Sequence, residues 1–261
     1  MTNAIEAAII KLLSSTERLT PAQIFAQFTY PRRKIMQSIN RLVNSEHLVF
    51  TYELGTAFVR LSFNKPVRLS ERIILVPPNR NIPKNMLSKI AVKLSSGAAF
   101  GDGHHPTTSL VVKLLDEILS NNSHIPVTKA LDVGTGSGIL AITAAKLGAE
   151  SVIATDIDPV AVYEAKTNVA INQLTNCVTL MRSDNLPENT YQLIMDNLRL
   201  PTLMSLAKKF YTIIDNKGFI LCSGYTNEES HFLVSKFKQL QLECLTQIKH
   251  NKWAAGVFIR K

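Results

Sequence analysis

The feature that most constrains the fold of this chain is a glycine-rich loop between an expected strand and an expected helix. Residues 130–138 have the sequence ALDVGTGSG, in which an apolar run leads into glycines at alternate positions and a helical pattern follows. Glycine allows tight turns, and it lets a ligand lie against the backbone where a Cβ would be in the way. The first turn of the following helix also presents free N–H groups. We therefore expect a ligand to bind against Gly134, Gly136 and Gly138.

The spacing of these glycines separates two classes of ligand. A dinucleotide-binding loop has the pattern G-x-G-x-x-G, which would require glycine at position 139, whereas this chain has Ile139 there and glycine at 138. The G-x-G-x-G spacing, preceded by Asp132, resembles motif I of the class I S-adenosylmethionine-dependent methyltransferases. The resemblance implies S-adenosyl-L-methionine as the cofactor, with Asp132 and the three glycines at its binding site. A tight strand-to-helix turn without a ligand is the alternative.

Acidic residues after the loop are further candidates for cofactor binding. Asp156 ends the next expected strand, about 20 residues past the loop, where a carboxylate can accept hydrogen bonds from both ribose hydroxyls. Asp158 lies close by, but Pro159 follows it, and this pair is better suited to capping the next helix. Asp184, just after the third strand, is placed to meet the adenine amino group, although a plain surface turn is nearly as compatible with it.

Strands and helices alternate along the chain from residue 128 onward. Expected strands are 129–133, 151–155, 177–181, 191–195, 218–222, 242–248 and 253–259, and expected helices are 106–120, 138–147, 159–172, 201–212 and 227–239. This alternation predicts an α/β fold, a doubly wound, Rossmann-like sheet of seven mostly parallel strands with helices on both faces. No helix separates the last two strands, so the final strand should run antiparallel.

The positive charge of the chain lies in its first third. The formal net charge is +9, and residues 1–95 hold 14 Lys and Arg against 5 Asp and Glu, whereas residues 96–261 hold 15 of each. Such asymmetry indicates that this part meets an anionic partner, such as nucleic acid or a ribosome surface. A basic face that only aids solubility is the alternative.

The sequence of this basic part predicts three helices. The first is expected over residues 4–14 and the third from about Pro31. The second is expected from Thr20 to about residue 28, and Gln23 can complete a capping box with Thr20. The third has apolar residues at helical spacing, namely Ile35, Met36, Ile39, Leu42 and Val43. Polar residues fall largely on its other side, and they include Arg33, Lys34, Gln37, Asn40 and Arg41.

Two β-like runs, 48–52 and 57–63, follow the three helices. This order resembles a winged helix-turn-helix domain, in which the third helix often enters a nucleic-acid groove. We expect residues 1–63 to form a winged-helix-like domain that recognises a substrate or partner, with Arg33, Lys34 and Arg41 as candidate contacts to nucleic acid or the ribosome. Docking of a protein and a purely structural role remain alternatives.

The proline-containing stretch 64–88 is expected to be a linker with one short strand at 72–76, and 89–261 to be the methyltransferase domain. The cysteines are odd in number and lack metal-ligand spacing, which favours a reducing cytoplasm and no metal site. The adjacent His104 and His105 rarely chelate one metal from a regular element. No apolar stretch approaches the roughly 18 residues needed to span a bilayer, so no membrane contact is expected.

Further segments resemble a particular family. Residues 97–108, GAAFGDGHHPTT, resemble the F-G-T-G-x-H-P-T-T segment of the ribosomal protein L11 methyltransferases. Residues 196–198 and 218–224 are similar to elements of its fourth and fifth strands, and the resemblance covers about 88–261. Asp102 and His104 stand where family members usually have threonine. The family's substrate-recognition domain is ferredoxin-like, so the cofactor chemistry carries over but the substrate does not.

The resemblance implies cofactor contacts from Thr107 or Thr108, Gly134, Asp156 and Asn197. Thr108 has the better spacing to the glycine loop. Phe100 is expected to cover the cofactor, although an aromatic residue there fits a core position equally well.

Asn197 is expected at the point of methyl transfer, where its side-chain carbonyl accepts a hydrogen bond from the incoming amine. The alternative is that Asn197 only fixes the loop after its strand. His105 is a candidate base, but capping or packing of a helix suits it better.

The favoured function is N-methylation of a lysine or amino group of a protein, ribosomal or translation-associated. The second reading is a nucleic-acid methyltransferase guided by the N-terminal domain. Enzymes that methylate exocyclic base amines commonly have Asn/Asp-Pro-Pro-aromatic after the fourth strand, and here residues 196–199 are DNLR. The third is a non-catalytic regulator that binds nucleic acid and senses S-adenosylmethionine.

Overall fold

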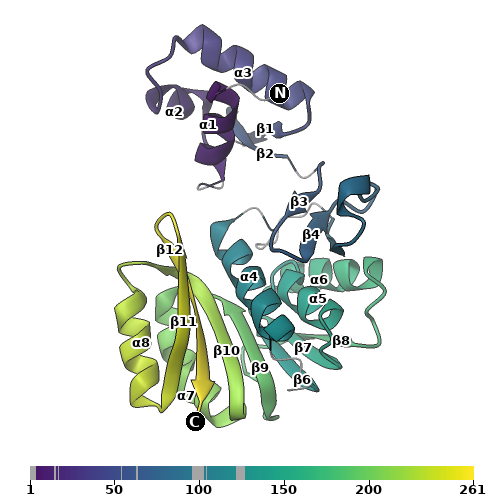
Figure 1. Ribbon diagram of the computed structural model, residues 1–261, viewed down its shortest axis with the longest axis vertical. Coiled ribbons are helices and arrows are strands. Elements are labelled where there is room, and N and C mark those ends of the chain that lie inside the picture. Colours follow the sequence, from purple (N-terminus) through teal and green to yellow (C-terminus); the bar gives the residue numbers. More distant parts are fainter. Residues whose placement is uncertain are drawn as a thin grey trace. The chain divides into compact units, whose positions relative to one another are not determined.

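The structure is a computed structural model that describes residues 4–14, 16, 18–53, 55–62, 64–95, 103, 105–121 and 127–261. The chain divides into two units, residues 1–66 with 79–81, and residues 67–78 with 82–261. Both units are drawn in Figure 1.

The first unit has three helices followed by a hairpin. These are α1 (Ala4–Leu13), α2 (Pro21–Ala26), α3 (Arg32–Asn44), β1 (Leu48–Glu53) and β2 (Thr56–Leu61), with β1 and β2 antiparallel. Its core takes residues from all five elements, namely Ile9, Leu13, Ile24, Ile35, Ile39, Leu42, Leu48 and Val59. The order of helices and strands is the one expected from the sequence, and the assignment to the winged-helix class remains a prediction.

The start of α2 shows how local sequence fixes this unit. The Thr20 hydroxyl accepts a hydrogen bond from the Gln23 N–H at 3.2 Å, and the Gln23 side chain accepts one from the Thr20 N–H at 2.8 Å. This is the expected capping box, with Pro21 in the first turn. Leu19 and Val59 exchange two backbone hydrogen bonds, so the chain before α2 is joined to β2.

The second unit is built on a seven-stranded sheet of order β11-β12-β10-β9-β6-β7-β8. Its strands are β6 (Lys129–Val133), β7 (Ser151–Asp156), β8 (Val178–Arg182), β9 (Tyr191–Asn197), β10 (Ile214–Thr226), β11 (Leu242–His250) and β12 (Trp253–Arg260). Both neighbours of β12 run antiparallel to it, and the other pairs are parallel. The predicted doubly wound sheet with an antiparallel final strand is confirmed.

Helices cover both faces of this sheet (Figure 1). One core joins the sheet to α4 (Pro106–Asn121), α5 (Ile139–Lys146) and part of α6 (Pro159–Ile171), and the other joins it to α7 (Leu200–Ile213) and α8 (Ser230–Gln239). The strand residues alternate between these two cores, which is why the buried strands are apolar on both faces. Of the helices within the described residues, none has the length and apolarity to cross a bilayer.

A small second sheet occupies much of the stretch that we expected to be a linker. It has the order β3-β4-β5, from β3 (Val67–Arg68), β4 (Ile73–Val76) and β5 (Ile90–Lys93), and a short 3₁₀ helix, η1 (Lys84–Met86), precedes β5. The strand expected at 72–76 is present as β4. All four β4 residues are buried and contribute to the second unit. The prolines of this stretch, of which Pro77 and Pro78 directly follow β4, disfavour a helix but do not prevent a buried strand.

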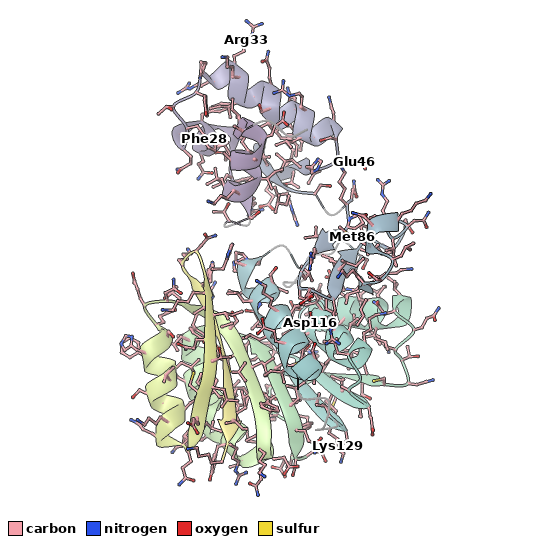
Figure 2. The ribbon with its side chains drawn as sticks, viewed as in Figure 1. Phe28, Arg33, Glu46, Met86, Asp116 and Lys129 are labelled. Carbon is pink, nitrogen blue, oxygen red and sulfur yellow. The ribbon has the colours of Figure 1, made fainter. Side chains whose placement is uncertain are left out.

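Asp116 on α4, which is labelled in Figure 2, binds Arg72 just before β4. Asp116 Oδ2 accepts the Arg72 backbone N–H at 3.0 Å, and Oδ1 accepts the Arg72 Nε–H at 2.6 Å. Burial alone would raise the pKa of this carboxyl, but hydrogen bonds from Arg72 and Ser70 outweigh burial and hold the pKa below its usual value. The ion pair therefore stabilises the fold in its charged form.

Replacing this carboxylate should destabilise the second unit. We expect Asp116→Asn to lower the free energy of unfolding by about 2–3 kcal/mol near pH 7, because a charged hydrogen-bond acceptor is lost inside the protein. The folded-state pKa is depressed, so this contribution is present above the unfolded pKa, roughly 4, and is lost as the pH falls through the folded value. Urea unfolding at several pH values measures it.

The matched control is Glu243→Gln. Glu243 pairs with Lys261 at 2.7 Å on the surface, where such a pair contributes at most about 1 kcal/mol. If Asp116→Asn costs no more than Glu243→Gln at neutral pH, Asp116 does not anchor β4 as described.

Candidate active site

The glycine loop follows β6 at the carboxyl edge of the large sheet, where ligands of open α/β sheets bind. Gly134, Gly136 and Gly138 have φ values of +69°, +55° and +84°, which side-chain-bearing residues rarely adopt. The N–H groups of Gly134 and Thr135 both donate to the Thr155 carbonyl at 2.9 Å, so the loop lies against the end of β7. The alternation of glycines thus reflects a backbone that bends where other residues would be strained.

Asp132, near the end of β6, stabilises this loop through buried hydrogen bonds. It is fully buried, and its Oδ2 accepts hydrogen bonds from the Thr135 hydroxyl at 2.6 Å and the Ala141 N–H at 3.1 Å. Burial raises the pKa of Asp132 to about 7, against these two hydrogen bonds, and the charge of Asp156 adds to the rise. Its Oδ1 is buried without a hydrogen-bond partner. Asp132 therefore joins the loop to the start of α5 and retains one free acceptor.

Asp156 ends β7 beside the loop. Its Oδ2 accepts the Gly136 N–H at 2.9 Å, and its Oδ1 accepts the Asp158 N–H at 3.0 Å. A carboxylate has about four acceptor positions, so about two remain for other donors. Asp158 accepts the Val160 N–H at 2.8 Å and caps α6, with Pro159 in the first turn, as predicted. The Asp156 carboxylate is therefore oriented by backbone groups on two sides.

Asn197 ends β9 and lies close to the start of α4. Its Nδ2 donates to the Thr108 hydroxyl at 3.2 Å, and its Oδ1 is buried without a hydrogen-bond partner. Thr107 is as buried as Thr108, but its hydroxyl is hydrogen-bonded to His105 Nδ1 at 2.6 Å. His105 Nδ1 also accepts the Thr107 N–H at 3.3 Å, and its ring packs edge-on to Trp253 at 5.1 Å. Thr108 is thus the threonine brought to Asn197, while His105 is engaged at the start of α4.

Two glycines fix the turn that carries Asn197. A Cβ at Gly134 would lie 2.6 Å from Leu198 Cδ2, and a Cβ at Gly224, where φ is +92°, would lie 2.3 Å from the Leu198 carbonyl oxygen. At Gly224 the added Cβ would meet the Leu198 backbone, which leaves no room for a side chain, whereas at Gly134 it would meet the end of the Leu198 side chain, which can shift.

The residue before Asn197 has a different environment. The buried side chain of Asp196 contacts Cys222 Sγ at 3.0 Å, and burial raises the pKa of Asp196 well above its usual value. Asp196 and Asn197 are neighbours in an extended strand, so their side chains emerge on opposite faces of the sheet.

The remaining predicted site residues have weaker support from the structure. Asp184 lies just after β8, is exposed, and accepts a hydrogen bond from the Asn185 side chain at 2.9 Å. This geometry is that of a surface turn and leaves the adenine contact a prediction. Phe100 lies outside the described residues. Within the described residues, no cluster of three His, Cys, Asp or Glu side chains is placed to hold a metal ion.

Sequence reasoning missed a bridge made by Asn168 of α6 and by Asn172, which caps the end of that helix. Asn168 is 1% exposed; its Oδ1 accepts the Ser95 N–H at 2.9 Å, and its Nδ2 donates to the Ser137 carbonyl at 2.9 Å. Asn172 binds both the N–H and the carbonyl of Lys93. Together they tie the end of β5 to the glycine loop. The asparagines lie one helical turn apart, but nothing in their spacing shows which distant backbone groups they meet.

Comparison with known proteins identifies the family. The sequence model of the ribosomal protein L11 methyltransferase family matches residues 60–261. The chain belongs to this family. The match starts 28 residues before the segment expected from the motifs, and so includes β3, β4 and β5.

Individual members of the family agree with this assignment. The ribosomal protein L11 methyltransferases of Pelobacter propionicus and Heliobacterium modesticaldum are 35% and 32% identical to the chain, each over 75% of it. A solved ribosomal protein L11 methylase from Lactobacillus delbrueckii subsp. bulgaricus superposes with a TM-score of 0.68 at 27% identity, over 75% of this chain and 98% of that one. The chain spans 63% and 61% of the two curated relatives, just under two thirds of their length.

Adding a side chain at Gly224 should disturb the Asn197 turn. We expect Gly224→Ala to destabilise the protein by about 2–4 kcal/mol, because the positive φ is strained for alanine and the added Cβ meets backbone that cannot rotate away. Urea unfolding measures the loss.

The matched control is Gly148→Ala, where φ is +108° and a Cβ meets no atom within 4 Å. This variant carries the backbone strain alone. Equal destabilisation by the two variants would show that the approach to Leu198 does not constrain the turn.

Proposed function

We propose that this protein is an S-adenosylmethionine-dependent N-methyltransferase whose acceptor is a lysine or amino group of a ribosomal protein. The observation that carries the proposal is the position of the Asp156 carboxylate. Asp156 ends β7, the strand next to β6, and it accepts a hydrogen bond from the Gly136 N–H of the glycine loop. A carboxylate fixed beside a glycine-rich loop suits a nucleoside with two ribose hydroxyls. The named substrate of the curated relatives supports the choice of acceptor.

The residues present fit S-adenosylmethionine in three respects. The glycine loop lacks a side chain at three alternate positions, Asp156 has unused acceptor positions, and buried acceptors at Asp132 and Asn197 lack partners. Orphaned buried polar atoms are costly unless a ligand or water satisfies them. We assign the ribose to Asp156, the amino-acid part to the glycine loop and Thr108, and the point of transfer to Asn197. When bound, the cofactor supplies an electrophilic methyl group on a sulfonium centre.

The chain's own residues must deliver a neutral amine. A lysine has a pKa of about 10.4, so deprotonation at pH 7 costs roughly 4.6 kcal/mol. Removal from water disfavours the ammonium and reduces that cost. The Asn197 Oδ1, which is buried without a partner, accepts a hydrogen bond from the amine and directs its lone pair along the line of transfer. Thr108 holds the Asn197 amide in this orientation.

We propose that residues 1–63 recognise the partner and that residues 89–261 carry out the transfer. Residues 1–66 and 79–81 contain nine Lys and Arg against four Asp and Glu, so an anionic partner, nucleic acid or the ribosome surface, suits this unit best. A ribosomal substrate also implies a cytoplasmic location. Asn197 is not followed by the prolines and aromatic residue that pin a flipped base, which favours a protein acceptor over a base.

Removal of the Asp156 carboxylate should impair cofactor binding. We expect Asp156→Ala to weaken binding of S-adenosylmethionine and of its demethylated product by about 10- to 100-fold, the loss of charged hydrogen bonds of roughly 1.5–3 kcal/mol. Isothermal titration calorimetry measures both ligands. Asp158→Asn is the control, because it changes a carboxylate that only caps α6. Wild-type affinity in Asp156→Ala would refute the ribose assignment.

Truncation of Asn197 should affect turnover more than binding. We expect Asn197→Ala to bind the cofactor within about threefold of wild type and to transfer methyl groups at least about tenfold more slowly, a barrier increase of roughly 1.4 kcal/mol. The assay is tritium transfer from the cofactor into cell lysate, which contains both proteins and nucleic acids, followed by protease or nuclease treatment.

Asn216→Ala, at an exposed position of β10, controls for loss of an asparagine as such. Unchanged turnover in Asn197→Ala would remove this residue from the mechanism. Nuclease-sensitive label would favour a nucleic-acid acceptor, and absence of label would favour a non-catalytic role.

A further inference from the structure

The carboxyl side chain of Asp196 lies in a core that is otherwise uncharged. Asp196 is fully buried, and its partner Cys222 belongs to the core that the large sheet forms with α7 and α8. The buried residues of these two helices are all uncharged. A carboxyl in such a core lowers stability unless its hydrogen bonds are satisfied, yet Asp196 Oδ1 has no partner. A cost of this kind is expected where a residue serves function.

Asp196 holds its proton more tightly than an ordinary carboxyl does. Burial raises its pKa well above the usual value, hydrogen bonds from the Cys222 thiol and the Leu198 N–H oppose the rise, and the charge of Asp132 adds to it. Burial also raises the pKa of Cys222 and of Tyr225, and the charge of Asp196 adds to both shifts. The titratable groups that act on Asp196 among the described residues therefore come from β6 and β10. The folded chain favours the protonated, uncharged carboxyl.

The carboxyl of Asp196 and the backbone group that it binds lie on either side of Asn197 in the chain. The Leu198 N–H donates to the carboxyl, so the side chain reaches the backbone two residues further on. An aspartate that does this fixes a turn of the backbone. The Cys222 thiol donates to Oδ2 at 3.0 Å and orients the carboxyl from β10. Asn197 is the residue inside this turn, and the turn therefore restricts its backbone angles.

The segment that joins β9 to α7 has few other polar contacts. Arg199, just before the first turn of α7, makes no side-chain hydrogen bond to the helix end, and no acidic residue lies in that turn. On the side of β10 the contact is steric, because a Cβ at Gly224 would lie 2.3 Å from the Leu198 carbonyl oxygen. A steric contact resists approach but not withdrawal, whereas the hydrogen bond to Asp196 resists withdrawal. The two contacts together fix Leu198.

Asn197 is thereby held from both faces of the sheet. Its Nδ2 donates to the Thr108 hydroxyl at 3.2 Å on the side of α4, and Asp196 projects from the other face because neighbouring residues of a strand alternate. Displacement of a reacting group by about 1 Å can slow a reaction about a hundredfold. We propose that Asp196, oriented by Cys222, is a positioning residue for methyl transfer, which holds the Asn197 amide in place from the opposite face of the sheet.

This inference deepens the proposed function. Its effect on turnover rests on the role of Asn197 in methyl transfer. Its effect on the geometry of Asn197 depends on neither cofactor nor acceptor, so turnover and geometry are measured separately.

Two variants of the full chain distinguish the hydrogen bond from the volume of the side chain. Valine is close to aspartate in size and suits a strand but accepts no hydrogen bond. Asp196→Val should therefore slow tritium transfer at least about tenfold and leave cofactor affinity within about threefold of wild type. The amide oxygen introduced by Asp196→Asn can still accept the Leu198 N–H, and transfer should stay within about threefold of wild type.

A third variant keeps the test open if Asp196→Val does not fold. Cys222→Ala removes the donor that orients the carboxyl and should slow transfer about fivefold, again with cofactor affinity retained. Wild-type turnover in Cys222→Ala would contradict the role given to the thiol.

Ile220→Ala controls for damage to the core. Ile220 is buried in the same core, on β10 two residues before Cys222. Its truncation opens a cavity and should lower the midpoint of urea unfolding, yet transfer should stay within about threefold of wild type.

The pH dependence of unfolding checks the state of the carboxyl. The folded chain keeps a proton that the unfolded chain releases above about pH 4, so this group lowers stability as the pH rises. The urea midpoint of Asp196→Val should therefore rise relative to wild type between about pH 5 and about pH 8.

The side-chain amide of Asn197 reports its own position. Its proton–nitrogen NMR resonances, assigned by their loss in Asn197→Ala, should move further in Asp196→Val than in Asp196→Asn or Ile220→Ala, in protein without cofactor. Wild-type turnover in Asp196→Val, an equal loss in Asp196→Asn, or unmoved Asn197 resonances in Asp196→Val would each overturn the inference.

Failure of the proposed function gives a different result. Slow transfer by Asn197→Ala together with normal transfer by Asp196→Val refutes this inference alone. Absence of transfer by the wild-type chain refutes the proposed function, and the Asn197 resonances then decide whether Asp196 positions that side chain.

Discussion

The hydrogen bond from the Gly136 backbone to Asp156 is the interaction on which the rest of the candidate site depends. It joins the loop after β6 to the end of β7, and the Thr155 carbonyl reinforces the junction by accepting two further N–H groups of the same loop. Its geometry requires a positive φ at Gly136. The carboxylate is therefore oriented by the main chain, which loses little conformational entropy on ligand binding because it is already fixed.

The site also contains features that do not favour stability. Asp132 is buried with one oxygen unsatisfied, and Asn197 holds a buried carbonyl without a partner. A fold selected for stability alone would place apolar residues or complete hydrogen-bond networks at such positions. The concentration of orphaned acceptors at the carboxyl ends of β6 and β9 marks the place where the protein gives up stability to present polar groups to a ligand.

Much of this organisation could be predicted from the sequence because the signals are local. Alternating strands and helices, the capping box at Thr20 and the Asp158-Pro159 cap depend on residues close together in the chain. The approach of Gly224 to Leu198 and the bridge from Asn168 to Ser137 join distant segments, and no periodicity encodes them. The linker expected at 64–88 illustrates the limit. Its prolines correctly indicated that no long helix forms there, but β4 is buried in the second unit, and the Asp116 side chain that binds Arg72 at its start lies 44 residues further on, in α4.

The small sheet determines where this protein can be divided. The chain leaves the first unit after residue 66, returns to it for residues 79–81, and then stays in the second unit. β4 therefore belongs structurally to the part that follows it, and the family match from residue 60 includes it. A truncation at residue 89, where the motifs begin, would leave β5 without its parallel neighbour and α4 with an uncompensated buried carboxylate. A cut just ahead of Val67 instead keeps β3, β4 and β5 together with the large sheet, and of the first unit it retains only residues 79–81.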